Sequence, residues 1–412
     1  MSGNWEETTL DEAVTFKGGG TPSKDNSAYW SGDIPWVSPK DMKSSTINNS
    51  IDKITTEAVE NSAASLIPRN SILVVVRSGI LARTIPVAIT SCDLAVNQDL
   101  KALYPKPDVD ARFLHYFMQM AEPQILKLVT RGATVHRLST ESLKSLRFPK
   151  PPLAEQQRIV AILDETFAGL ATATANAEKN LKNARELFES CLDEALANEE
   201  WSRRTLYEIA APDCSLSYGI VQPGNEVSDG LPVVRPVDLG AELVRVGGLK
   251  RIDPVRAQGY SRTRLKGGEL LLCVRGTTGS ISIASEELAG GNVTRGIVPI
   301  RFDPSQMIQR FGYYALLSKT VQRQIGAKTY GAALMQINIR DLRNLSVPVP
   351  PLPEQEKVAT RLEGLGRQTS RLIEINESRL VQLKTLKEAL LQRAFSGELT
   401  APPTEAINEA AE

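Results

Sequence analysis

The sequence contains two closely similar segments, PPLAEQQRIVAILDE at residues 151–165 and PPLPEQEKVATRLEG at residues 350–364. The repetition runs through the whole chain at an offset of about 200 residues, the length of one repeated module. Matched residues include Trp5 with Trp201, Leu10 with Leu206, Pro39 with Pro236, Arg77 with Arg275, and Gly132 with Gly331. A chain that repeats itself in this way is expected to fold as two copies of one unit.

Each module has a strand-rich front and a helical back. Short apolar runs such as residues 71–76 and 269–274 predict buried strands. After each Pro-Pro pair, apolar residues recur at alternating steps of four and three, which predicts a helix of about 65 Å with a coiled-coil seam. Small or polar seam residues such as Thr174 and Asn376 are expected to fix the register of that seam.

These patterns predict a mixed α/β fold. Two tandem-repeat globular domains would be separated by two long helices that form an antiparallel coiled-coil spacer, giving a pseudo-twofold dumbbell. The alternative is that each helix packs separately on its own domain. The expected parts are a first domain at residues 1–151, a central helix at 152–199, a second domain at 200–350, a C-terminal helix at 351–398 and a disordered tail at 399–412.

The charge of the chain is balanced overall but uneven along its length. Lys plus Arg and Asp plus Glu both number 48, yet residues 201–350 have a basic excess and residues 151–200 an acidic one. Globular parts that face a polyanion would explain this distribution, although uneven surface charge without a partner is the alternative. Because no secretory signal and no long apolar run occur, we expect a cytoplasmic protein without a membrane partner.

The sequence offers little for catalysis. It has two histidines and four widely spaced cysteines without a C-x-x-C pair, so neither a metal site nor a catalytic triad is expected. His115 lies in the apolar pattern FLHYF and is interpreted as a packed histidine. The phosphate-binding pattern G-x-x-x-x-G-K-S/T is absent, as are the motifs of a DNA adenine methyltransferase. We therefore expect no enzymatic activity, no catalytic residue and no cofactor in this chain.

Two related but different domains on a rigid spacer suit a partner with two separate binding sites, such as DNA. Two half-sites that are one helical turn apart on DNA are separated by about 34 Å. The chain resembles the specificity subunits of type I restriction-modification systems from Trp5 to about Leu399. The resemblance is carried by the Trp-x-x-x-x-Leu openings, GGGTPS, YWSGDIPWVSPKDM, NQDLKAL and the two L-x-x-L-x-x-P-x-PPL-x-EQ junctions. The junction motif is the most specific of these.

The resemblance implies a role in bacterial defence. Each target recognition domain would read one half of a bipartite double-stranded DNA site, and the helices would set the spacing and dock two methyltransferase subunits. Adenine methylation, and restriction by translocase-nuclease subunits, would then follow on the partners. S-adenosylmethionine, ATP and Mg would be bound by the partners. The alternative is a non-enzymatic coiled-coil scaffold with two heads for protein or glycan ligands, whose binding would depend less on salt.

Candidate DNA contacts follow from residue type and placement. Arg77 and Arg275 end matched strands beside glycines and suit guanine or phosphate, with a strand-end salt bridge as the alternative. Asn97 and Gln98 suit adenine, and their counterparts Thr294 and Arg295 differ in type; loop capping is the alternative. The stretch from Lys17 through Gly19, Gly20 and Thr21 suggests a loop with exposed amides for a phosphate, or else a plain turn.

The remaining candidates complete these groups. In the first module they are Lys40, Ser78, Arg131, Thr134 and His136, and in the second Arg235, Thr277, Thr278, Tyr330 and Gln336. The loop containing Arg131 and Thr134 is matched by residues 330–335, where Leu334 and Met335 are either contacts or core. Acidic helices repel phosphates and are better suited to docking a protein, so we expect partner contacts at the helix starts, at Glu155, Gln156, Glu354 and Gln355.

Overall fold

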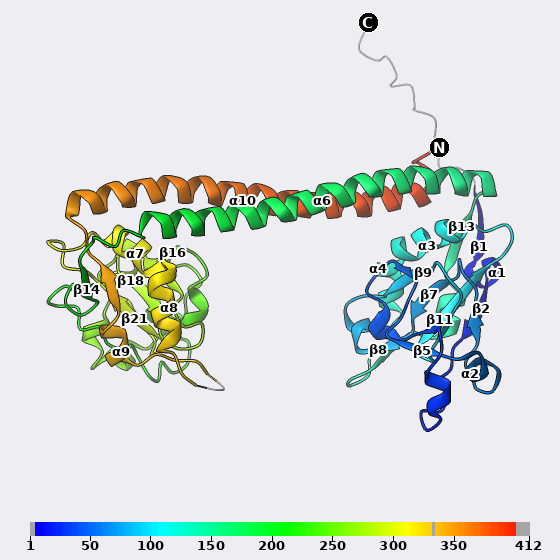
Figure 1. The fold of residues 1–412 in the computed structure, drawn as a ribbon, viewed down its shortest axis with the longest axis horizontal. Coiled ribbons are helices and arrows are strands. Elements are labelled where there is room, and N and C mark those ends of the chain that lie inside the picture. The colour runs from blue at the N-terminus through cyan, green and yellow to red at the C-terminus, as the bar shows by residue number, and fades with distance from the viewer. Residues whose placement is uncertain (1–4, 332–333, 401–412) are drawn as a thin grey trace, which may run out of the picture. The chain divides into compact units, whose positions relative to one another are not determined.

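The computed structural model describes residues 5–331 and 334–400. It divides into unit 1, within Met1–Ala177 and Ser378–Glu412, and unit 2, Glu178–Glu377 (Figure 1). Ala332 and Ala333 of the expected contact loop lie outside the described residues, as does most of the expected tail. None of the described helices is both long and apolar enough to cross a bilayer.

Unit 1 contains a five-stranded sheet in the order β2-β11-β7-β9-β4 and a four-stranded sheet in the order β5-β3-β10-β6. Two further pairs are β1 with β13 and β8 with β12. The strands are β1 (Glu6–Thr9), β2 (Val14–Gly18), β3 (Ile34–Val37), β4 (Thr46–Ile47), β5 (Asp52–Ile54), β6 (Leu66–Ile67), β7 (Ile72–Val75), β8 (Arg77–Ser78), β9 (Val87–Thr90), β10 (Leu94–Val96), β11 (Leu100–Pro105), β12 (His136–Arg137) and β13 (Arg147–Lys150). Because β3·β10 and β4·β9 are parallel and the other pairs antiparallel, the sheets are mixed.

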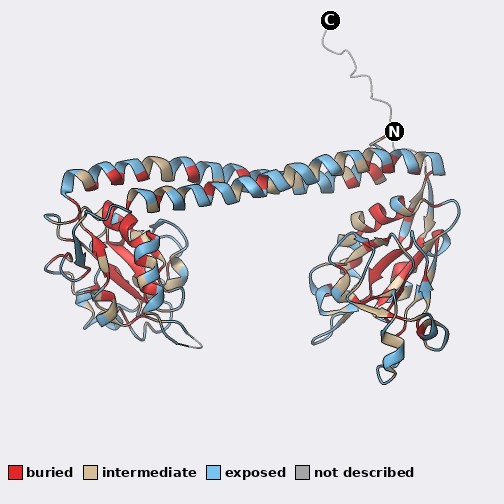
Figure 2. Cartoon of the chain, in the orientation of Figure 1, coloured by how far each residue is buried: buried red, intermediate tan, exposed pale blue. Residues whose placement is uncertain are grey.

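Strand β7 explains why an unbroken apolar run marks the centre of the unit. Its four residues, ILVV, are all fully buried, since the strand lies between β11 and β9 and both of its faces are covered. Figure 2 shows the buried residues concentrated on these central strands and on the helix that covers them. The short helices of unit 1 are α1 (Leu10–Ala13), α2 (Thr56–Glu60), α3 (Ala111–Met120), α4 (Glu122–Lys127) and α5 (Thr140–Lys144).

Unit 2 repeats this plan with shorter strands. Its sheets have the orders β16-β19-β18-β21, β17-β15-β20 and β14-β22. The strands are β14 (Arg203–Thr205), β15 (Leu231–Val234), β16 (Leu243–Val244), β17 (Arg251–Ile252), β18 (Leu270–Cys273), β19 (Ile281–Ala284), β20 (Asn292–Val293), β21 (Ile297–Ile300) and β22 (Ser346–Pro348), and the helices α7 (Gln309–Leu317), α8 (Lys319–Ala327) and α9 (Ile339–Arg343). The register is also repeated, because Ile72 pairs with Leu103 in unit 1 and Leu270 with Ile300 in unit 2.

The two long helices are α6 (Leu153–Ala195) and α10 (Leu352–Phe395), and each contributes to both units. In unit 1 the ammonium of Lys387 lies 5.3 Å from the ring centre of Phe167. In unit 2 the guanidinium of Arg185 lies 3.2 Å from the carboxylate of Glu377. Further along, a Cβ on Gly366 would lie 3.4 Å from the Phe188 ring. Residue numbers along α6 therefore rise as those of the neighbouring α10 residues fall, so the two helices are antiparallel. The predicted mixed α/β fold with antiparallel long helices is confirmed.

His115 lies on α3 and is 7% exposed, with Nε2 3.0 Å from Nε2 of Gln119. Burial, assisted by the charges of Arg112 and Lys387, lowers the pKa of His115 to about 4. The packed interpretation of this histidine therefore holds. Its counterpart in unit 2 is Tyr313, which carries no such proton-binding ring.

Acidification is expected to destabilise unit 1 through His115. As the pH falls from 6.5 towards 4, the unfolded chain binds a proton that the folded chain excludes, which costs up to about 3 kcal/mol. Chemical denaturation measured at a series of pH values should show this loss below pH 6.5. In His115→Gln the same series should lose this component, and an identical pH dependence in wild type and variant would contradict the prediction.

Candidate nucleic-acid interface

In unit 1, loops that are distant in sequence are joined by hydrogen bonds at the ends of neighbouring strands. The amide of Asn97 donates to the carbonyl of Val37 at 2.9 Å, and the Thr21 hydroxyl donates to Oε1 of Gln98 at 2.6 Å. Ser78 pairs with His136 through β8 and β12. We call these loops, residues 19–21, 38–41, 77–79, 97–99 and 131–136, the loop face of unit 1.

Unit 2 has an equivalent loop face, formed by residues 219–221, 235–238, 275–278, 294–296, 330–331 and 334–336. Gln336 forms β-bridges with Arg275 and Tyr330, and Ile220 bridges Thr294. The hydroxyl of Thr278 donates to the carbonyl of Met335 at 3.2 Å. The amide of Thr294 donates to the carbonyl of Val234 at 2.9 Å, and that of Val274 to the carbonyl of Gly296 at 2.7 Å. All eight candidates of the second module, from Arg235 to Gln336, therefore lie in loops that hydrogen bonds join to one another.

The matched arginines differ in their surroundings. Arg77 has a side chain 47% exposed, and its Nε lies 3.9 Å from the carboxylate of Asp99, so part of its charge is offset. Gly296 takes the place of Asp99 in unit 2. Nε of Arg275 is buried, and no described residue accepts a hydrogen bond from it. The loop face of unit 2 thus carries a less compensated cation, which suits an anionic ligand.

The glycine-rich stretch is not the open phosphate loop expected from its sequence. Lys17 ends in solvent, but it belongs to β2 together with Gly18. Gly20 is buried and its amide donates to the carbonyl of Val96 at 3.0 Å. A Cβ on Gly19 would lie 2.0 Å from the same carbonyl oxygen. The glycines are therefore required by close packing on β10, and the amide of Gly20 is unavailable to a phosphate.

Asn97 also differs from the expectation. It is 6% exposed, its Nδ2 donates to Asp99 at 3.0 Å, and its Oδ1 accepts from the Asp99 amide at 3.0 Å. The side chain closes the turn between β10 and β11 and is not presented to a base. The loop-capping alternative applies to Asn97, whereas Gln98 is exposed.

Two further candidates are already paired within the protein. Lys40 Nζ lies 2.7 Å from Asp52, and this hydrogen bond raises the pKa of Lys40. Arg235 binds Asp238 at 2.9 Å. The position that matches Lys40 in unit 2 is Val237, which is 79% exposed and was missed by the search for polar contacts. Aligning IPWVSPKDM with LPVVRPVDL identifies it, and an exposed apolar side chain suits a thymine methyl group.

The hairpin loops are exposed in both units. Arg131 and Thr134 are exposed, and the Gly132 amide donates to Nδ1 of His136 at 3.3 Å. In unit 2 the exposed fractions of Tyr330, Leu334 and Met335 are 49%, 45% and 46%. Leu334 and Met335 are therefore surface residues and not core.

The glutamines at the two helix starts have a structural role. Gln156 accepts from the Asp110 amide at 2.8 Å and donates to the carbonyls of Asp108 and Pro151 at 3.0 and 2.8 Å. Gln355 repeats this with the Ile308 amide and the carbonyls of Gln306 and Pro350, each at 2.8 Å. Both glutamines are 0% exposed, so they anchor helix to domain and offer nothing to a partner. Glu155 and Glu354 remain partly exposed.

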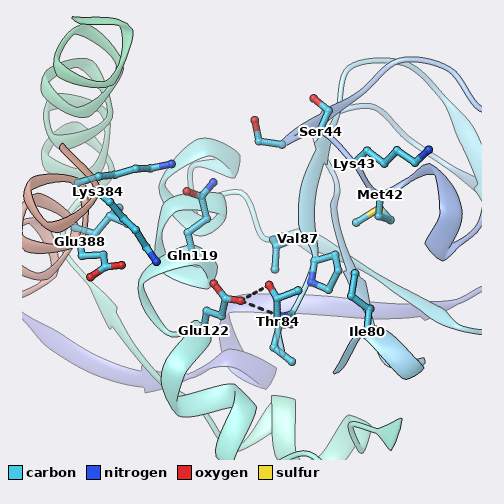
Figure 3. A pocket seen from close by; sticks show the side chains of 15 residues that line it. Met42, Lys43, Ser44, Ile80, Thr84, Val87, Gln119, Glu122, Lys384 and Glu388 are labelled. Atoms are coloured by element: carbon cyan, nitrogen blue, oxygen red, sulfur yellow. Dashed lines mark hydrogen bonds between the residues drawn. The ribbon is translucent and has the colours of Figure 1, made fainter. Parts of the chain in front are cut away.

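A cavity of about 500 Å³ in unit 1 lies between α10 and the segment around β9 (Figure 3). Glu122 accepts hydrogen bonds there from the Thr84 hydroxyl at 2.5 Å and from the Ile85 amide at 2.9 Å. Lys384, Lys387 and Glu388 of α10 also line the cavity. None of the candidate DNA contacts lines this cavity. Over the described residues, no three His, Cys, Asp or Glu side chains gather as metal ligands.

Two related α/β units, each with a loop face that carries exposed polar side chains, define a duplicated α/β protein. The chain belongs to the family described as type I restriction modification DNA specificity domain, whose model matches residues 2–183 and 254–384.

Similar proteins cover different shares of the chain. It is 41% identical over 165 residues to the Escherichia coli type I restriction enzyme EcoR124I/EcoR124II specificity subunit, covering 40% of this chain and 41% of that protein. It is 26% identical to the E. coli EcoBI specificity subunit, covering 66% and 62%. The Methanocaldococcus jannaschii MjaIX specificity subunit is 25% identical, with 96% and 94% covered. The chain thus spans less than two thirds of the length of the EcoR124I/EcoR124II and EcoBI subunits.

Solved structures share the fold. A chain from a study of complex assembly and conformational transition of the type I R-M system has a TM-score of 0.73 at 19% identity, covering 96% of this chain and 98% of that one. The HsdS subunit from Thermoanaerobacter tengcongensis has a TM-score of 0.55 at 18% identity, covering 97% and 98%. Both support the α/β architecture described above.

Proposed function

We propose that this chain is the non-catalytic DNA-recognition subunit of a type I restriction-modification complex, in which each loop face reads one half of a bipartite duplex site. The observation that carries the proposal is the pair of matched loop faces, which share a backbone framework but differ in their exposed side chains. A shared framework with different residues suits two half-sites of different sequence, because base edges are distinguished by the donors and acceptors facing them.

The loop faces also supply charges for the DNA backbone. Arg77 and Arg131 in unit 1 and Arg275 and Arg295 in unit 2 would grip phosphates or guanine, and the other loop residues would position them. Such contacts release counterions, so binding would weaken steeply with salt. A scaffold for protein or glycan ligands has no such requirement, and family membership does not favour it.

In the proposed complex, partner subunits carry out methylation and restriction. Two methyltransferase subunits would dock on the repeated helical segments at residues 152–199 and 351–398, with Glu155 and Glu354 as contacts. They would bring S-adenosylmethionine, and translocase-nuclease subunits would bring ATP and Mg, in the cytoplasm. The recognition domains would be residues 1–151 and 200–350, with the helices setting the distance between half-sites.

Single-molecule methylation mapping tests this function. Cells that express the neighbouring methyltransferase with this chain should carry N6-methyladenine in a split motif, and cells without the chain should not. Absence of any dependent motif, with both proteins expressed and soluble, would contradict the recognition role.

A matched pair of arginine variants locates the role within unit 2. Arg275→Ala should weaken binding to the mapped site by about 10- to 100-fold, because it removes a charge or bidentate contact worth about 1–3 kcal/mol. Arg340→Ala removes the same charge from the exposed surface of α9 and should leave the dissociation constant nearly unchanged. Equal effects of the two variants in titrations at fixed salt would argue against a specific role for Arg275.

A further inference from the structure

The turn after β10 and the turn after β20 have the same backbone hydrogen bonds. The amides of Asn97 and Thr294 both donate at 2.9 Å, to the carbonyls of Val37 and Val234 respectively. The next element begins alike, since Leu100 donates to Asn97 at 3.3 Å and Ile297 to Thr294 at 3.0 Å. Residues 96–100 and 293–297 are therefore equivalent, and Gln98 occupies the same place as Arg295.

Both of these side chains are exposed at the tips of their turns, while their neighbours are fixed. Asn97 closes its turn through Asp99, and the Thr294 hydroxyl donates to the Val234 carbonyl at 3.3 Å. The guanidinium of Arg295 forms no ion pair with any described residue, unlike those of Arg77 and Arg235. Each turn thus presents one exposed polar side chain next to residues that hydrogen bonds hold in place.

The residue beside each exposed side chain suits the hydrogen-bonding groups of that side chain. In unit 1 the Thr21 hydroxyl donates to Oε1 of Gln98 at 2.6 Å, which orients the amide of this exposed side chain. The equivalent of Thr21 is Val221, because Gly20 and Ile220 donate to Val96 and Val293 in the same way. A side-chain amide has a donor end and an acceptor end, whereas a guanidinium carries donors only. No neighbouring hydroxyl is therefore needed to orient the donors of Arg295.

We propose that Gln98 and Arg295 are equivalent specificity-determining residues, each reading one base of its half-site in the major groove. Gln98, oriented by Thr21, donates its NH₂ to an acceptor on a base edge. Because a carbonyl oxygen has two lone pairs, Oε1 can accept from Thr21 and also from the N6 amino group of an adenine, which would make the contact bidentate. Arg295 donates to O6 and N7 of a guanine. This assignment rests on the proposed recognition function.

Methylation mapping of reciprocal variants, each assembled with the methyltransferase, tests the assignment. Gln98→Arg should switch one base of one half-site towards guanine, changing the preference there by about 10- to 100-fold. The other half-site and the spacing should stay the same. Arg295→Gln should alter only the opposite half-site. Thr21→Val should relax the Gln98 position by up to about 10-fold, because the amide is then free to rotate.

Gln98→Ala separates the possible outcomes. If the assignment holds, this variant loses discrimination at one base only and keeps the thermal unfolding midpoint of the wild type. A motif read with wild-type preferences by Gln98→Ala and Gln98→Arg would overturn the assignment while leaving the recognition function intact. Failure of the wild-type chain to direct any split motif would overturn the function itself.

Discussion

Replacement of Gln156 by leucine is expected to lower the free energy of unfolding by about 3–5 kcal/mol, since each buried polar group left unpaired costs about 1–3 kcal/mol. The groups left without their partner are the amide of Asp110 and the carbonyls of Asp108 and Pro151. Urea denaturation of the full chain should show this loss in the transition of unit 1.

The adjacent Gln157 provides the control. Gln157 is exposed on the same turn of α6, so Gln157→Leu makes the same chemical change without leaving a buried polar group unpaired. The free energy of unfolding of this variant should stay within about 0.5 kcal/mol of wild type. Gln355→Leu should reproduce the large loss in unit 2. A loss below about 1 kcal/mol for Gln156→Leu would show that the helix is anchored by other contacts.

Alanine at Gly19 is expected to destabilise unit 1 by about 3 kcal/mol, at the upper end of the cost of overpacking. The added Cβ would lie 2.0 Å from the Val96 carbonyl oxygen and 2.5 Å from that of Asn97. Because backbone atoms cannot rotate away, β10 or its turn must move. Gly219→Ala meets the Val293 carbonyl oxygen at the same 2.0 Å and should have a similar effect in unit 2.

The same substitution should have the opposite sign at Gly169. This glycine lies within α6, and no heavy atom lies within 4 Å of the point that a Cβ would occupy, so alanine adds helix propensity without a clash. Gly169→Ala should stabilise the chain by about 0.5–1 kcal/mol. Thermal unfolding of the three variants in parallel measures these effects, and destabilisation by Gly169→Ala would refute the expectation.

Repetition and periodicity were sufficient to predict most of the fold. The heptad seam predicted two long helices, and the buried residues Ala177, Thr369 and Asn376 belong to that seam. The apolar runs predicted β7 and β18 because both are covered on two faces. These features depend on patterns over many residues, which a single sequence displays directly.

Individual site residues were harder to predict, because their roles depend on tertiary neighbours. A run of three glycines suggests a flexible loop until β10 is placed against Gly19. Gln156 looks like a surface residue in a polar EQQ sequence, and its burial follows only from the loop at Asp108. The side chain of Asn97 accepts a hydrogen bond from the amide of Asp99, two residues away. This Asx turn is the one local sequence signal that could have predicted that Asn97 is not free to contact a base.

The packing of α10 has a consequence for the order of folding during synthesis. Leu391 and Ala394 belong to the core of unit 1, and the Phe395 ring lies 4.9 Å from that of Phe113. The domain that leaves the ribosome first therefore lacks part of its interior until the last long helix emerges. Unit 2, made from residues 178–377, needs no such late segment. The nascent first domain therefore leaves apolar surface uncovered until α10 is made, and such surface favours aggregation and chaperone binding.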